Sequence, residues 1–79
     1  MKTSKVEREQ LLALNKKIGQ NIRKLRKERG FSQEILAYEA GVERSQMGKI
    51  ERGAGVSIGT LFKLSKTLKV EIRDFFDNI

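Results

Sequence analysis

The 79-residue sequence contains no cysteine, histidine, proline or tryptophan. Without cysteine there is neither a disulfide framework nor a thiolate metal site, and without histidine the commonest general base and metal ligand are missing. We therefore expect no bound metal, no cofactor and no catalytic residues, and the chain does not read as an enzyme. No apolar run approaches membrane-spanning length and no signal-peptide pattern opens the chain, so we expect a cytoplasmic protein without a membrane partner.

The balance of charge is strongly basic and unevenly placed. The net charge is +7, and residues 1–30 hold ten Lys and Arg residues against three Glu. A basic surface favours a polyanionic partner, and nucleic acid is the usual one. Small basic domains also occur for reasons of solubility alone, so charge is only weak support. The content of 38% hydrophobic and 34% charged residues fits a single small helical domain and is too apolar for disorder.

The first thirty residues have the spacing of an amphipathic helix. Its apolar positions recur at steps of three and four and predict one buried stripe: Leu11, Leu14, Ile18, Ile22 and Leu25. Ser4 and Glu7 match a capping box, so the helix can begin as early as Lys5, and Gly30 would end it. Either one long helix or a short additional one fits this pattern. We therefore divide the chain into an N-terminal extension, residues 1–14, which we expect to be helical, and a domain of residues 15–79.

The segment from Phe31 to Gly53 is the most informative part of the chain. Ser32 is suited to cap a short helix, and Gly41 to end it in the left-handed conformation. A second helix then starts at about residues 43–44 and runs to residue 52, with Met47 and Ile50 turned inward. Two short helices joined by a tight turn, the second polar and basic on its outer side, are typical of a helix-turn-helix.

Two further helices complete an all-α domain. Ser57 is placed to cap a fourth helix, whose inward residues we expect to be Leu61, Phe62, Leu64 and Leu68. A last short helix follows residues 70–71 and carries the apolar residues of the C-terminus. The sequence thus predicts a compact bundle of about five helices.

The motif words LRKERGFSQEILAYEAGVERSQMGKIERG and SIGTLFKLSKTLKVEIRDFF resemble the phage-repressor (XRE, Cro-like) helix-turn-helix family. The resemblance covers about Ile18 to Phe76. The LAY run at residues 36–38 and the Arg44-Ser45 opening of the second motif helix also resemble a subgroup, the restriction–modification controller proteins. The family implies a lambda-repressor-like DNA-binding domain.

The outer side of the second motif helix carries the expected base contacts. If Met47 and Ile50 face inward, the outward residues are Arg44, Ser45, Gln46 and Lys49. Arg pairs with guanine through two parallel donors, Gln with adenine, and Ser with several bases. The family resemblance implies base contacts at these positions. An ordinary solvated helix face is the alternative reading for such residues when no helix-turn-helix surrounds them.

The resemblance also implies contacts with the DNA backbone and one structural ion pair. The backbone contacts are expected from Gln33, Arg23, Lys27, Arg52, Ser57 and Thr60. Gln33 would also steady Arg44, although a simple helix-starting residue is the alternative. Arg26 and Glu51 are expected to pair and tie the first helix to the second motif helix, because a half-buried carboxylate needs a partner.

Family members often pair through the C-terminal end, which gives an expected dimer interface of Val70, Ile72, Phe75, Phe76 and Ile79. The alternative for Phe75 and Phe76 is that they close the core, and we expect this of one of them. The long first helix is a second candidate for that interface. The resulting hypothesis is a transcriptional regulator that binds double-stranded DNA sequence-specifically, as a homodimer on a pseudo-palindromic operator. The alternative is an antitoxin-like or other interaction module whose main partner is an unknown protein. A membrane-surface role for the first helix is disfavoured, because the core needs its apolar stripe.

Overall fold

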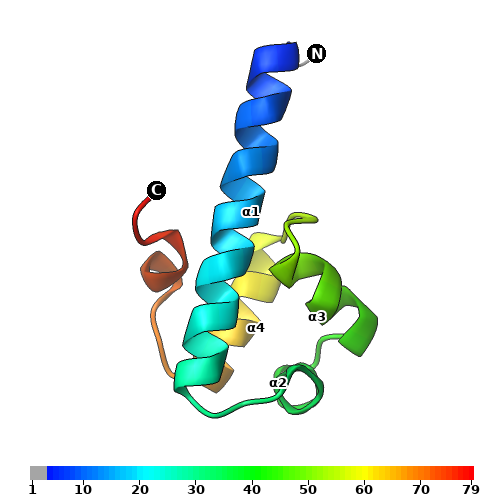
Figure 1. Ribbon diagram of the computed structural model, residues 1–79. Helices are drawn as coiled ribbons and strands as arrows, with labels where there is room; N and C mark the ends of the chain where they lie inside the picture. Colours follow the sequence, from blue (N-terminus) through cyan, green and yellow to red (C-terminus); the bar gives the residue numbers. More distant parts are fainter. Residues whose placement is uncertain (1–3) are drawn as a thin grey trace.

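The computed structural model describes residues 4–79 and contains four α-helices and a terminal 3₁₀ turn (Figure 1). The elements are α1 (Lys5–Glu28), α2 (Gln33–Ala40), α3 (Arg44–Glu51), α4 (Ile58–Leu68) and η1 (Ile72–Phe76). No strand occurs within the described residues. The all-α prediction is confirmed, but the expected fifth α-helix is only a 3₁₀ segment. The first three residues of the expected extension lie outside the described part of the chain.

The predicted capping box is present and starts α1. The Ser4 Oγ accepts a hydrogen bond from the Glu7 backbone N–H at 3.1 Å, and the Glu7 carboxylate accepts one from the Ser4 backbone N–H at 3.3 Å. Hydrogen bonding from Ser4 to the Glu7 carboxylate, by its side chain first and by its backbone N–H second, favours the charged form and lowers the pKa of Glu7 below its ordinary value. From this cap, α1 continues without a break for 24 residues, so the first of the two readings, one long helix, is correct.

The core lies against the C-terminal half of α1. In Figure 1, α3 and η1 lie on opposite sides of that half, with α2 and α4 completing the body. The buried residues come from all five elements: Ile18, Ile22, Leu36, Ala37, Val42, Met47, Ile50, Leu61, Leu64, Leu68 and Phe75. The N-terminal half of α1 extends beyond the body. Leu11 is therefore 51% exposed, and its expected place in the core is wrong.

Two glycines set the helix-turn-helix geometry. Gly41 has φ +73° at the end of α2, the left-handed conformation that glycine adopts cheaply, and it turns the chain into α3. Gly19 lies in the middle of α1 under the C-terminal end of α3. A Cβ atom there would collide with the carbonyl oxygen of Ile50 and lie 2.9 Å from that of Glu51. The two helix backbones therefore touch at a point that only glycine permits.

Helix α4 begins as expected and differs in one inward residue. The Ser57 Oγ accepts the backbone N–H of Thr60 at 3.1 Å and caps the helix. Leu61, Leu64 and Leu68 are buried, but Phe62 is 51% exposed. The expectation that Phe62 points inward is wrong, and its ring instead lies 5.2 Å from the Lys66 Nζ. Within residues 4–79, no helix is both long and apolar enough to cross a bilayer.

Candidate nucleic-acid interface

The orientation of α3 is fixed by what it buries. Met47 and Ile50 lie in the core, as the sequence predicted, and they are joined by Gly48 and Glu51. The outward side consists of the four expected base-contacting residues, all exposed: Arg44, Ser45, Gln46 and Lys49. Three of these four lie in the first turn of α3, the part of a recognition helix that reaches base edges.

A buried ion pair connects α3 to α1. The Arg26 Nε lies 2.6 Å from the Glu51 Oε2, and the Arg26 Nη2 donates to the Glu51 Oε1 at 3.1 Å. This two-pronged geometry is the strongest arrangement for a guanidinium and a carboxylate. The Arg26 Nη1 also donates to the Phe31 carbonyl at 2.8 Å, which anchors the loop before α2. The pair implied by the family resemblance is thus present.

Gln33 belongs to the same network. Its Nε2 donates to the Glu51 Oε1 at 3.0 Å, so Glu51 accepts hydrogen bonds from both α1 and α2. The side chain of Gln33 is half-buried, with its amide nitrogen directed to Glu51. The sequence did not predict this contact, because two residues 18 positions apart give no local signal for it. The network holds the start of α2 and the end of α3 in a fixed relation.

The other expected backbone-contacting residues lie on α1, directly after α3 and at the start of α4. Arg23, Lys27, Arg52 and Ser57 are exposed and Thr60 is half-buried. The Ser57 hydroxyl caps α4 and also donates to the Thr60 Oγ1 at 3.0 Å. Both hydroxyls are therefore engaged with each other, and a phosphate would have to share them. The basic side chains remain free to extend into solvent.

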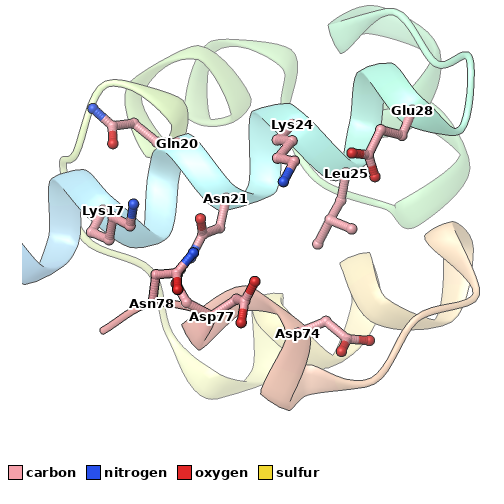
Figure 2. Close-up of a pocket in the computed structure, with 9 residues that line it drawn as sticks. All are labelled: Lys17, Gln20, Asn21, Lys24, Leu25, Glu28, Asp74, Asp77 and Asn78. Atoms are coloured by element: carbon pink, nitrogen blue, oxygen red, sulfur yellow. The ribbon is translucent and has the colours of Figure 1, made fainter.

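The C-terminal segment is fastened to α1 by one side chain. The Asn21 Nδ2 donates to the backbone carbonyls of Phe75 and Asp77, at 2.9 Å in each case. Figure 2 shows Asn21 pointing from α1 across a groove towards the last residues of the chain. The two bonds fasten the short 3₁₀ segment η1 to α1 and so help to fix its position.

This attachment changes the expected dimer surface. Phe75 is completely buried in the core, so its assignment to the interface is wrong. Val70 and Ile72 are half-buried, whereas Phe76 is 37% and Ile79 is 58% exposed. A C-terminal apolar surface therefore exists, but with fewer residues from η1 than expected.

Helix α4 contributes to the exposed apolar surface two residues that the sequence analysis did not assign there. Ile58 and Phe62 lie one turn apart on α4 and are both exposed. Phe62 lines a shallow pocket together with Val70 and Ile72, so the two surfaces adjoin. The spacing of Ile58 and Phe62 was the available signal, since these positions flank the stripe of Leu61, Leu64 and Leu68 rather than lie in it.

Comparison with known proteins identifies the same motif. A family model described as helix-turn-helix matches residues 22–75. The HTH-type transcriptional regulator SlrR of Bacillus subtilis is 47% identical over 62 residues, which are 76% of this chain and 41% of SlrR. The chain likewise covers only 56% of the related regulator SinR of that organism, so it spans about half the length of these two relatives.

Solved structures agree with this match. The crystal structure of the restriction–modification controller protein C.AhdI from Aeromonas hydrophila is similar with a TM-score of 0.75 and 40% identity, covering 86% of this chain and 98% of that one. The crystal structure of SinR in complex with DNA is similar with a TM-score of 0.72 and 42% identity, covering 76% of this chain and 98% of that one.

Proposed function

The chain belongs to the helix-turn-helix family, and from this membership we propose that it is a transcriptional regulator that binds double-stranded DNA sequence-specifically. The observation that carries the proposal is the outer side of α3. Four exposed polar or basic side chains stand on a helix whose opposite side is buried and clamped by the Arg26–Glu51 pair.

The proposed binding mode follows from the chemistry of these side chains. Helix α3 enters the major groove, where Arg44 offers two parallel donors to guanine, and Gln46 pairs with adenine. Ser45 and Lys49 complete the base contacts. The phosphates are held by Arg23, Lys27 and Arg52, by the hydroxyls of Ser57 and Thr60, and by the start of α2 at Gln33.

The network around Glu51 gives Gln33 a role in positioning. Because its Nε2 is engaged with Glu51, its phosphate contact would come from the backbone N–H at the start of α2. Gln33 then links the phosphate to the buried ion pair, and through Glu51 to α3. The depth of α3 in the groove would in this way be set by the position of the DNA backbone.

We further propose that two copies act together on a pseudo-palindromic operator. The exposed apolar residues of α4 and the C-terminus offer a self-complementary surface: Ile58, Phe62, Val70, Ile72, Phe76 and Ile79. A two-fold dimer would place its α3 helices about 34 Å apart, one turn of DNA. A protein with this role works in the cytoplasm and needs neither a cofactor nor a catalytic group.

In-vitro selection from random duplexes, followed by a shift assay on the enriched sequence, tests the proposal. We expect an enriched motif with inverted repeats and at least about 1,000-fold tighter binding than to random DNA of the same length. Failure to enrich any motif, with equal binding of all duplexes, would contradict the proposed function. The alternative function, an interaction module whose main partner is a protein, predicts this outcome, in which no motif is enriched.

A further inference from the structure

The N-terminal half of α1 carries a basic stripe that the described body does not use. The residues of this basic stripe are Lys5, Arg8, Leu12 and Lys16, which follow one another at steps of three and four and therefore share one side of the helix. All four are exposed. Leu12 is the only apolar member, and the other three side chains carry a positive charge.

The basic stripe lies on the same side of α1 as α3. Continuing the spacing, the next position after Lys16 is Gly19, whose Cα faces the carbonyl oxygens at the end of α3. Gly53, which follows α3, packs directly on the backbone of Lys16, where an added Cβ would come within 3.0 Å of the Lys16 Cα. The line of the stripe thus passes beneath the C-terminal end of α3 and then continues outward.

Beyond that point the stripe has no intramolecular partner. The N-terminal part of α1 extends away from the body in Figure 1, and within residues 4–79 neither Lys5, Arg8 nor Lys16 forms an ion pair. The stripe also keeps a net positive charge. Glu7 is engaged with Ser4 on another side of the helix, and Glu9, four residues after Lys5, is an acidic neighbour of the three basic residues that forms no ion pair within residues 4–79.

The basic stripe is long enough to contact several phosphates of a duplex. Lys16 follows Lys5 by eleven positions along the α-helix, a rise of about 16 Å. That length of duplex carries roughly nine phosphate charges, one for each 1.7 Å of axis. The capping box at Ser4 and Glu7 keeps the stripe helical to its end, so its charges are held in a fixed row. Three cations spaced over this length on one side of a helix can each meet a phosphate of a neighbouring backbone.

We propose that the basic stripe binds DNA phosphates outside the base pairs that α3 reads. The inference rests on the proposed function and adds to it a contact surface, a ligand chemistry and three residues: Lys5, Arg8 and Lys16. Because phosphates are the same in every sequence, the stripe raises affinity for all duplexes and leaves base preference unchanged.

A salt titration of DNA binding separates this contact from a general effect of charge. The test variant is Lys5→Gln/Arg8→Gln, and the matched control is Lys24→Gln/Lys63→Gln. The control removes the same two charges from exposed sites on α1 and α4 away from the stripe. Glutamine is a good helix former, and circular dichroism verifies that both variants retain the helicity of the wild type.

The expected result is a change in the slope of log binding constant against log salt. Each lost phosphate contact lowers the slope by about 0.9, so the test variant should lose about 1.8 and the control much less. Binding of the test variant to the selected and to random duplexes should weaken by the same factor. The single variant Lys16→Gln should lose about 0.9.

Two results overturn the inference, and they are distinguishable. If the wild type selects a sequence but the test and control variants have equal slopes, the stripe does not touch DNA while the proposed function stands. If the wild type shows no preference among duplexes, the proposed function fails and this inference fails with it.

Discussion

The carboxylate of Glu51 lies between Arg26 of α1 and Gln33 of α2, and it accepts hydrogen bonds from both side chains. It sits at the end of α3, so the three helices that carry the proposed DNA contacts, α1, α2 and α3, meet at this single group. Burial of a charge is costly unless partners surround it. Glu51 is therefore a structural connection between the three helices, as the expected ion pair with Arg26 implied.

Removing this carboxylate should destabilise the fold strongly. Glu51→Ala leaves the Arg26 guanidinium buried without its partner, and we expect a loss of about 3–5 kcal/mol in the free energy of unfolding. Urea denaturation followed by circular dichroism measures it. The control is Arg73→Ala, which breaks the exposed pair with Glu71 and should cost less than about 1 kcal/mol. Losses of similar size in the two variants would contradict the role given to Glu51.

Two glycine substitutions should have opposite effects. Gly19→Ala places a methyl group against the carbonyls of Ile50 and Glu51, so α1 and α3 must separate, at a cost of about 1–3 kcal/mol or more. Gly59 of α4 has open space, with only the Ser57 Oγ near at 3.9 Å. Gly59→Ala should therefore raise the melting temperature slightly, through lower chain entropy of the unfolded state. Stabilisation by both substitutions would show that the close helix contact is absent.

The exposed aromatic residues of the C-terminal surface should control association. Analytical ultracentrifugation of the wild type should give a dimer, whereas Phe62→Glu and Phe76→Glu should each give a folded monomer. Both rings are accessible in the single chain, so a charge there opposes pairing without disturbing the core. The control is Tyr38→Glu on the exposed side of α2, which should remain dimeric. A monomeric wild type at high concentration, or a dimer in every variant, would refute this interface.

The N-terminal turn of α1 should loosen in acid. The folded-state pKa of Glu7 is lowered by its bonds to Ser4. The stability of the cap is therefore present above the ordinary Glu pKa of about 4.3 and is lost as the pH falls through the lower, folded value. The amide protection factors of residues 7 and 8, which are exchange rates corrected for their intrinsic pH dependence, should fall over that range in the wild type, and Glu7→Gln should show lower protection near neutral pH. Glu9→Gln is the control, and an identical profile for Glu7→Gln and Glu9→Gln would rule out the capping role.

Local patterns predicted most of the fold. The capping serines at positions 4, 32 and 57 and the glycine at position 41 gave the boundaries of the helices, because these signals act within one turn of the chain. The inward face of α3 followed from Met47 and Ile50 for the same reason. The predictions that were wrong depended on distant parts of the chain. Leu11 continues the apolar stripe of α1 beyond the end of the body, where nothing covers it within the described residues. Phe75 fills a core position that only the completed fold defines.

The candidate site was predicted less completely than the fold. Exposure of Arg44, Ser45, Gln46 and Lys49 follows from the period of α3, but their choice of bases does not, because it depends on a partner outside the chain. The bond from Gln33 to Glu51 joins two helices and has no local pattern. The sequence likewise does not show that the basic stripe lies on the side of α1 that faces α3. That follows from two contacts in the fold, of Gly19 with the end of α3 and of Gly53 with the backbone of Lys16.

The most direct test of the account is the base preference of Arg44→Ala on the selected duplex and on each of its single-base substitutions. We predict that Arg44→Ala loses about 1–3 kcal/mol on the selected sequence and no longer discriminates at one base position in each half-site, while discrimination elsewhere is retained. Arg23→Ala, the control at a proposed phosphate contact, should weaken binding to all duplexes by one common factor. If Arg44→Ala also weakens all duplexes equally and keeps every base preference, α3 does not read the sequence through this residue, and the central claim is wrong.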